Sequence, residues 1–344
     1  EARAAAVRVQ RAGEEPRWCR DPGTTLPERI ADFPQEVLQE AADLGGLSGP
    51  SILYALFEDS LRRARGESVD EHRDRIAELW ARFSAVASAN PYAWDRTAHD
   101  AASIRTESPD NRMIAFPYTK AMVANNGVDM GSALLMCSVD AARAAGVERD
   151  RMVFPRVSTA SHETWLVTER RDLHRVPALE TAGRVALATA GLTIDDIDHV
   201  DLYACFPSIV QMSAAALGLD QQRQLTVTGG LGFAGSPIAN SSGHAIAAMV
   251  PLLREGGNGL VHANGGFATK HAFGVYSADP PKAYVSMDCN DQVDHRSRPT
   301  GPADESADGT EEASTVVYDR DGPTQTVTAR LAPDERRRFV IEKA

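Results

Sequence analysis

The chain has 344 residues, of which 43% are apolar and 24% are charged. This composition is typical of a globular protein with a buried core, and it excludes a wholly disordered chain, a collagen and a coiled coil. Lys and Arg total 36 against 48 Asp and Glu, and the resulting net charge of -12 argues against a general nucleic-acid-binding surface.

The sequence also argues against a membrane span and a metal site. No apolar run approaches the roughly 20 residues that a spanning helix needs. The charged start differs from a signal peptide, so we expect a cytoplasmic protein. The cysteines at 19, 137, 205 and 289 are scattered, with no C-x-x-C pair that would indicate zinc. Since Glu1 falls within an apparent helix that has no N-cap, we expect the sequence to begin inside a larger protein.

Residues 30–118 predict a helical domain with an irregular end. Helices are expected at about 35–47, 51–65 and 68–89. The last begins with a capping box formed by Ser68 and Glu71. Residues 90–118 are rich in Pro, Asn, Asp and Ser and predict an irregular connection.

Residues 119–278 alternate helices with strands, which predicts a layered α/β domain. The helices are expected at 132–146, 177–191, 207–217 and from the end of a Gly-rich turn at 229–243 to about 254. The strands are expected at 152–158, 200–203, 258–263 and 272–277.

The last part of the chain, residues 279–344, predicts a linker and a small β module. Residues 290–312 are polar and acidic, as in a solvated linker. The segment that follows alternates apolar and polar residues around Asp321-Gly322, which indicates a hairpin. Because a lone hairpin is marginally stable in water, we expect it either to be part of a small β module or to dock on the main body.

Three bends between strands and helices carry the candidate site residues. In the first, DLYACFPS at 201–208, Tyr203 or Cys205 follows a strand at a sheet edge where α/β proteins bind ligands. Cys205 equally fits a core position.

The second bend is TGGLGFAGSPIANSSGH at 228–244. Its glycines, Gly230 and Gly235 among them, allow the backbone to approach a ligand closely. The amino end of the following helix favours an anion or a developing oxyanion. His244 in that helix is either a polar active-site group or a partly buried residue with a satisfied ring.

The third bend is HANGGFATKH at 262–271. Asn264, Gly265 and Gly266 could present N–H groups as an oxyanion hole. Lys270 and His271 precede the next strand and equally fit a solvated loop.

Together with PYTKAMVANNGVDMGSALLM at 117–136, these bends resemble the carboxyl-terminal half of the thiolase superfamily. The similar branch is that of acetyl-CoA acetyltransferase-like, type 1 thiolase-like proteins, which are related to the sterol-carrier-protein thiolases. The resemblance spans about residues 1–278.

The resemblance implies a fold, domains and partners. It implies part of the layered α-β-α-β-α thiolase fold, with a helical loop domain at 30–118 covering the coenzyme A site. Residues 1–29 would be a remnant of the amino-terminal half, and 119–278 would be mostly the carboxyl-terminal half. It further implies a homodimer, and coenzyme A thioesters as substrates without a permanently bound cofactor.

The chain departs from the thiolase pattern at three positions. Ser236 aligns with the histidine of Gly-His-Pro, Ala263 with the second catalytic cysteine, and Tyr203 with the Asn or His that holds the oxyanion water. The nucleophilic cysteine of the family would precede Glu1.

Three interpretations therefore remain open. The first is an acyl-CoA acyltransferase of lipid metabolism, using Tyr203, Cys205, Ser236, His244 and His271. The second is a retro-aldol lyase that acts on a β-hydroxyacyl-CoA through Tyr203. The third is a scaffold that binds thioesters without catalysis. All three require Tyr203, Ser236 and Asn264 to meet at one cavity.

Overall fold

The computed structural model describes residues 49–344, except 238–239, 296 and 300–308. The predicted helix at 35–47, the segment assigned as a thiolase remnant at 1–29 and Cys19 lie outside the described residues.

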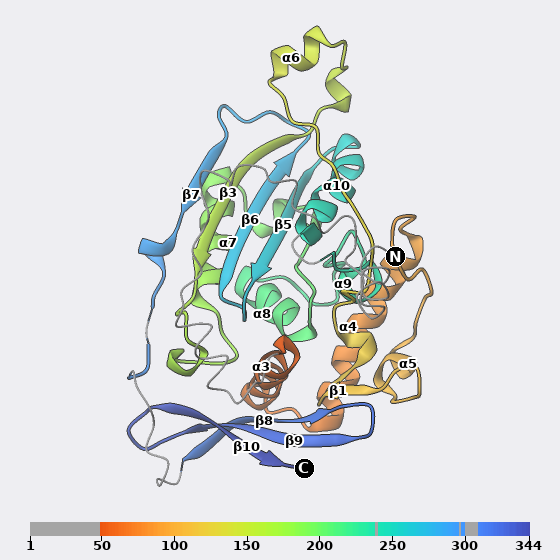
Figure 1. Cartoon of the computed structure of the whole chain (residues 1–344). Helices are drawn as coiled ribbons and strands as arrows, with labels where there is room; N and C mark the ends of the chain where they lie inside the picture. The colour runs from red at the N-terminus through yellow and green to blue at the C-terminus, as the bar shows by residue number, and fades with distance from the viewer. Residues whose placement is uncertain (1–48, 238–239, 296, 300–308) are drawn as a thin grey trace, which may run out of the picture.

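A five-stranded mixed sheet forms the centre of the molecule (Figure 1). In spatial order its strands are β4 (His199–Asp201), β5 (Asn258–Gly265), β6 (Lys270–Ser277), β3 (Phe154–His162) and β7 (Val285–Asp288). β5 pairs antiparallel with β6, and β6 pairs antiparallel with β3, while the outer strands β4 and β7 are parallel to their neighbours. The four predicted strands are present, but β4 ends at Asp201, before Tyr203, and β6 begins at Lys270, so Lys270 and His271 lie within the strand that they were expected to precede. The sheet extends past 278 because β7 pairs with β3.

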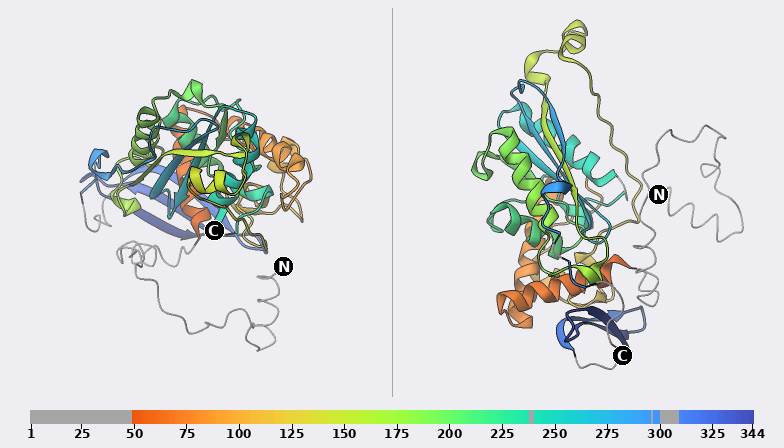
Figure 2. Two further views of the ribbon diagram at one scale, coloured as in Figure 1. Left: turned by 90° about the horizontal axis from the view of Figure 1, so that it is seen from above. Right: turned by 90° about the vertical axis from the view of Figure 1, so that its left-hand side faces the viewer.

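Helices cover both faces of this sheet (Figure 2). Alternate side chains of a strand point to opposite faces. Phe273 of β6 therefore packs with the main core, on the side of α7 (Pro177–Ala190) and α8 (Pro207–Leu217). Val261 of β5 packs instead against α10 (Ser241–Arg254), in a smaller cluster with Met249. The described part of the chain thus contains one α-β-α unit.

The predicted bounds of α7 and α8 are confirmed because their ends carry strong local signals. Each helix begins with Pro in its first turn, where no backbone N–H is needed. Each ends at a glycine in the left-handed region, Gly191 with φ 67° and Gly218 with φ 72°.

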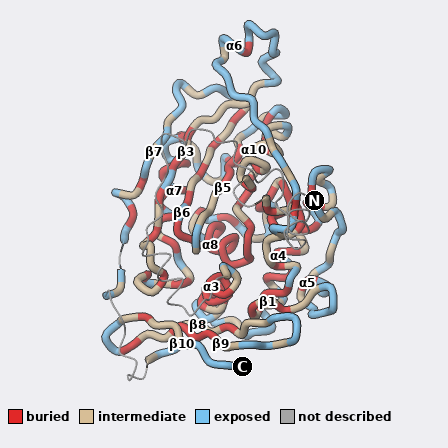
Figure 3. Tube along the Cα trace, viewed as in Figure 1, coloured by how far each residue is buried: buried red, intermediate tan, exposed pale blue. Residues whose placement is uncertain are grey.

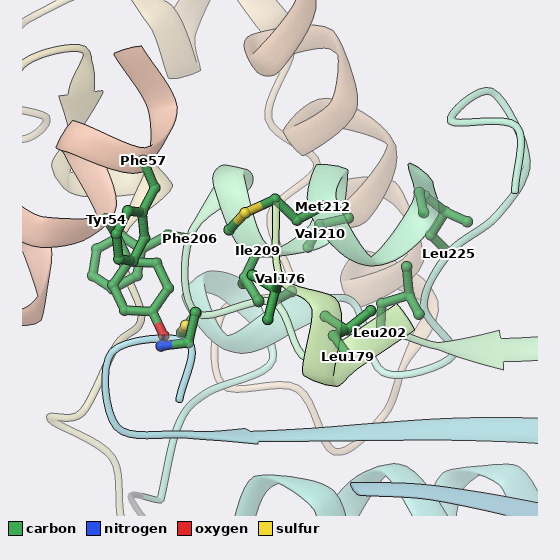
Figure 4. Packing of buried hydrophobic residues seen from close by; sticks show 14 of the residues in the cluster. Tyr54, Phe57, Val176, Leu179, Leu202, Phe206, Ile209, Val210, Met212 and Leu225 are labelled. Atoms are coloured by element: carbon green, nitrogen blue, oxygen red, sulfur yellow. Dashed lines mark hydrogen bonds between the residues drawn. The ribbon is translucent and has the colours of Figure 1, made fainter. Parts of the chain in front are cut away.

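Two long helices, α3 (Pro50–Arg65) and α4 (Val69–Ala89), pack beside the sheet. The capping box at the start of α4 is confirmed: the Ser68 hydroxyl accepts from the Glu71 N–H, and the Glu71 carboxylate accepts from the Ser68 N–H. The buried side of α3 joins the core where the Tyr54 ring stacks on Phe206 at 4.5 Å (Figure 4).

A second five-stranded sheet lies against α3 at the end of the molecule opposite α6. In spatial order its strands are β10 (Arg337–Lys343), β9 (Pro323–Leu331), β8 (Thr310–Tyr318), β1 (Met113–Ala115) and β2 (Tyr118–Thr119). The β8–β9 hairpin confirms the turn predicted around Asp321-Gly322. The tail docks on the main body, the second of the two expected arrangements, since β8 pairs with β1. This pairing joins segments placed in two different domains by the sequence.

The remaining helical segments are short. They are α5 (Ala101–Arg105), α6 (Val139–Ala144), α9 (Gly230–Phe233) and the 3-10 turns η2 (Lys120–Met122), η3 (Arg149–Arg151), η4 (Val167–Glu169), η5 (Ile194–Asp196) and η7 (Asn290–Gln292). Within the described ranges, no helix combines the length and apolarity required to cross a membrane.

The helix predicted at 132–146 is largely wrong. Only α6 is helical there, and residues 123–138 lead to it without helical turns beyond the C-cap of η2. This segment projects from the body, and the side chains of Leu135 and Met136 are 97% and 76% exposed (Figure 3). A short helix needs packing partners to be stable, and this segment packs too little against the described core to supply them.

Candidate functional site

The first bend leads from the end of β4 into α8. β4 ends at Asp201, and the N–H of Leu202 donates to the carbonyl of Leu225. Leu202, Ala204 and Phe206 enter the core, whereas Tyr203 between them stays partly exposed. The alternation of the extended backbone therefore turns Tyr203 away from the neighbouring core side chains.

The second bend packs tightly against two other parts of the chain. Gly230 has φ 76°, and a Cβ there would lie 2.6 Å from the Phe83 ring of α4. Gly235 has φ 107°, and a Cβ there would lie 2.5 Å from Met130 Sδ. Both glycines are therefore required by backbone conformation and close packing.

These two bends and α10 enclose a cavity of about 460 Å³, which we call the Tyr203 cavity. Its size is within the usual range of small-molecule sites. Four sequence-predicted residues line it: Tyr203, Gly230, Gly235 and His244. The wall also includes Asp201, Thr228, Ser241 and His262 together with apolar side chains such as Leu231, Ala247 and Pro251.

The titratable side chains of the cavity favour their neutral forms. Burial, assisted by the nearby Cys205 thiol, raises the pKa of Tyr203 to about 12. Burial lowers the pKa of His244 below its ordinary value. At neutral pH Tyr203 is therefore a phenol that can donate a hydrogen bond, and His244 is a neutral imidazole.

Two buried polar atoms at the start of α10, Ser241 Oγ and His244 Nε2, make no hydrogen bond of normal geometry. The Ser241 hydroxyl is nevertheless near enough to the Tyr203 hydroxyl to reduce slightly the rise in the pKa of Tyr203 that burial causes. Buried polar atoms are normally satisfied, so unpaired ones in a cavity wall are candidates for contact with a ligand. The amino end of α10 adds the positive end of the helix dipole to this wall.

Cys205 and Asn264, from the first and third bends, meet outside this cavity wall. Asn264 Nδ2 donates to the Tyr54 hydroxyl at 2.9 Å and lies 3.9 Å from Cys205 Sγ. The Tyr54 hydroxyl also accepts from the Ala268 N–H and donates to the Gly266 carbonyl. Burial raises the pKa of the Cys205 thiol to about 12, so Cys205 is a protonated core thiol at neutral pH.

His271 lies in the core of the sheet. Its Nε2 donates to the Ala268 carbonyl at 3.1 Å, and its Nδ1 is 3.2 Å from His262 Nε2. Burial lowers the pKa of His271 to about 3. This neutral, hydrogen-bonded ring fits a structural role, in contrast to the solvated loop position expected from the sequence.

Of the third bend only His262 lines the Tyr203 cavity, so the meeting of Tyr203, Ser236 and Asn264 expected at one cavity is not observed among the described residues. Asn264 and Gly265 line a second, more open depression of about 320 Å³. Ser236 is buried beside Gly235, its N–H donates to the Asn125 carbonyl, and it does not line the Tyr203 cavity. His262 lies within β5 and reaches the cavity, whereas Asn264 and Gly265 at the end of β5 lie beyond it. This difference depends on the fold and cannot be read from spacing along the sequence.

No cysteine of the described segments lines the Tyr203 cavity. Cys137 is exposed on the segment before α6, not within a helix, and Cys289 is buried beside β7. A thiolate for acyl transfer is thus not provided at this cavity by the part of the chain that the structure describes.

Asp201 and Ser241 are two residues of the cavity wall that were not predicted as site residues from the sequence. Asp201 is an acidic residue between Val200 and Leu202 in a buried strand, and an isolated charge in such a place needs compensating groups. An acidic residue between two apolar residues at a buried strand is therefore the sequence signal that could have pointed to Asp201. Ser241 stands at the start of a predicted helix, where serine commonly serves as a cap. Its position in the cavity wall depends on how α10 packs, which the sequence does not show.

Comparison with known proteins identifies the family. Residues 159–226 match the family described as thiolase C-terminal domain-like. No curated protein matches the chain. A crystal structure of a monomeric SCP2-thiolase like protein type 1 from Mycobacterium smegmatis is similar at 37% identity, with a TM-score of 0.79 over 88% of this chain and 68% of that one.

That relative is described as monomeric, which gives no support to the homodimer expected from the sequence. The fold, the matched region and the identity agree with the resemblance seen in the three bends. The chain therefore belongs to the thiolase superfamily, among the SCP2-thiolase like proteins.

Proposed function

We propose that this protein is an enzyme that acts on a coenzyme A thioester, whose acyl part binds in the Tyr203 cavity. Membership of the thiolase superfamily supports the substrate class. Tyr203 and the amino end of α10 line the same cavity, and this observation supports a role in stabilising negative charge on a thioester oxygen.

The reaction that this chemistry supports best is cleavage of a carbon–carbon bond through an enolate, as in a retro-aldol lyase. Such a reaction needs a hydrogen-bond donor at the thioester oxygen and a proton acceptor, but no covalent acyl-enzyme. The neutral Tyr203 phenol supplies the donor, and the nearby Ser241 hydroxyl at the start of α10 is a second donor.

The acyltransferase of lipid metabolism is the second candidate, because family membership favours it. It requires a thiolate to carry the acyl group. The Cys205 thiol, with its raised pKa and buried position, is a poor candidate. A scaffold that binds thioesters without turnover is the third interpretation.

The test uses 3-hydroxyhexanoyl-CoA, which a retro-aldol lyase would convert to butanal and acetyl-CoA. Both products are measured by chromatography and mass spectrometry. Tyr203→Phe removes the phenol donor and should lower kcat by about 10²–10⁴-fold. Tyr284→Phe, a change at an exposed tyrosine away from the cavity, should leave kcat unchanged.

Other outcomes identify the alternatives. An acyl adduct on the protein after incubation with hexanoyl-CoA, together with release of coenzyme A, would establish acyl transfer instead. Binding of the thioester by calorimetry without any product would support the scaffold. Equal rates for Tyr203→Phe and the unmodified protein would rule out the role given to Tyr203.

A further inference from the structure

Asp201, the last residue of β4, carries a carboxylate in an almost fully enclosed position. The residue is only 5% exposed, and its strand is paired with β5. Burial of an ionised carboxylate is costly unless hydrogen bonds compensate for the lost water. The two oxygens of this carboxylate differ in the number of hydrogen bonds that they accept.

All hydrogen bonds of this carboxylate go to one oxygen, Oδ2. The hydroxyls of Thr226 and Thr228 donate to it at 2.9 and 3.0 Å. The backbone N–H groups of Val227 and Thr228 donate to it at 2.9 and 3.1 Å. The chain between β4 and the second bend therefore wraps around one side of the carboxylate.

The other oxygen, Oδ1, makes no hydrogen bond among the described residues. Unlike Ser241 Oγ and His244 Nε2, it is not fully enclosed by the protein. It therefore remains accessible, and Asp201 lines the Tyr203 cavity. An accessible carboxylate oxygen that takes no donor from the protein can accept a hydrogen bond from a molecule in the cavity. Oδ1 can therefore accept a hydrogen bond from a donor group that enters the cavity.

The other groups at this cavity define the kind of donor. No Lys or Arg of the described residues lines it, and its other titratable side chains are Tyr92, Tyr203, His244 and His262. The ligand must therefore supply the donor itself. A hydroxyl is the simplest such donor, because it needs only the one acceptor that Oδ1 offers.

We propose that Asp201 Oδ1 binds a hydroxyl group on the acyl part of the substrate and accepts its proton during carbon–carbon cleavage. This inference rests on the proposed function and assigns the proton acceptor that the lyase reaction needs. Burial raises the pKa of Asp201 above its ordinary value, which makes its carboxylate a stronger base.

The step balances without any further reactant. The β-hydroxyl proton moves to Asp201 Oδ1, and the electron pair of that O–H bond forms the new C=O bond. The bond between Cα and Cβ breaks, and its electron pair forms the enolate of the shortened thioester. A proton taken up at Cα then gives the acyl-CoA product, and Asp201 returns its proton to solvent.

The main test is Asp201→Asn, studied in the whole chain. The amide oxygen can take the four donors that Oδ2 accepts, while the amide NH₂ replaces Oδ1 at the cavity. We expect the unmodified protein to bind 3-hydroxyhexanoyl-CoA about tenfold to a hundredfold more tightly than hexanoyl-CoA, as a hydrogen bond to a charged group allows. In Asp201→Asn this preference should vanish and cleavage should be lost, with hexanoyl-CoA binding retained.

The matched control is Asp198→Asn. Asp198 lies just before the other end of β4, is exposed, and accepts from the Asn258 N–H outside the cavity. This control should keep both the preference and the turnover. Retention of the preference and the turnover in Asp201→Asn would overturn the inference while leaving the proposed function intact. Failure of the unmodified protein to bind either thioester would instead overturn the proposed function.

A second variant covers the case in which Asp201→Asn does not fold, as judged by circular dichroism. Thr228→Val removes one donor from Oδ2 and so destabilises the charged carboxylate, which raises the pKa of Asp201 further. Since the reaction needs the ionised form, the acidic limb of the kcat/KM profile should move to higher pH. An acidic limb at the same pH as in the unmodified protein would contradict the role of Asp201.

Discussion

Two groups of buried polar side chains differ in how completely they are hydrogen-bonded. The first, the Glu58 network, lies between α3, α4 and α8. Glu58 Oε1 accepts from Gln211 at 2.6 Å and lies 2.6 Å from His72 Nε2, and Glu58 Oε2 accepts from the Tyr118 hydroxyl at 2.7 Å. The second is the Tyr203 cavity, where Ser241 Oγ and His244 Nε2 make no hydrogen bond and all hydrogen bonds of the Asp201 carboxylate go to Oδ2.

The comparison separates structural polar groups from groups that await a ligand. Partners in the Glu58 network satisfy one another, so removal of one leaves the others unpaired in the core. The enclosed atoms Ser241 Oγ and His244 Nε2 at the cavity already carry the cost of lost hydration, which a ligand can recover. The accessible Asp201 Oδ1 can exchange water for a ligand. Stability should therefore be sensitive in the first group and activity in the second.

The largest effect on stability is expected for Glu58→Ala. The change leaves the Tyr118 hydroxyl, the Gln211 amide and His72 without their acceptor. We expect the free energy of unfolding in urea to fall by about 3–5 kcal/mol, the usual cost of breaking a buried charged cluster. Glu78→Ala, at an exposed position of α4, should change it by less than about 0.5 kcal/mol. Equal losses of unfolding free energy in Glu58→Ala and Glu78→Ala would show that the Glu58 network does not stabilise the fold.

An intermediate effect is expected from the protonation of His271. Its pKa of about 3 in the folded protein lies below the ordinary value of 6.5. Stability is therefore full above about pH 6.5 and is lost as the pH falls from there toward 3, because only the unfolded chain takes up the proton.

From pH 6.5 to pH 5 this histidine should cost about 2 kcal/mol, measured by urea unfolding at each pH. The variant His271→Asn should be less stable at pH 7 but should lose less stability over the same interval. An equal loss in both proteins would show that His271 is not kept neutral by the fold.

The smallest effect on stability is expected for His244→Leu. Because His244 Nε2 has no partner, its replacement breaks no hydrogen bond of that atom and removes an unsatisfied group. The free energy of unfolding should change by less than about 1 kcal/mol, measured by thermal unfolding. A loss above about 2 kcal/mol would place His244 with the structural group and weaken the distinction between the two regions.

The parts of the fold that could be predicted from the sequence are those with local signals. Pro177 and Gly191 bound α7, Ser68 with Glu71 starts α4, and Asp321-Gly322 marks the β8–β9 turn. In each case the chemistry that sets the boundary lies within a few residues of it. Periodicity alone was insufficient at 132–146, where an apolar pattern lacks a packing partner among the described residues.

The candidate site was predictable only in part. Tyr203, Gly230, Gly235 and His244 do line one cavity, because the first two bends follow neighbouring parts of the fold. Asn264 and Cys205 form a separate contact, and His271 enters the core, since the register of β5 with β6 decides which way each side chain points. Asp201 could be recognised as a candidate site residue only from the structure, because all hydrogen bonds of its carboxylate go to one oxygen, Oδ2.

The pairing of β8 with β1 has a consequence for how the protein forms during synthesis. Val317 lies opposite Ala115, and the N–H of Phe116 donates to the carbonyl of Val316 at 2.8 Å. About two hundred residues separate these partners along the chain, so a ribosome must complete β8 before β1 gains this neighbour. Until then the outer side of α3 stays uncovered, and a nascent chain stalled short of β8 presents it to chaperones.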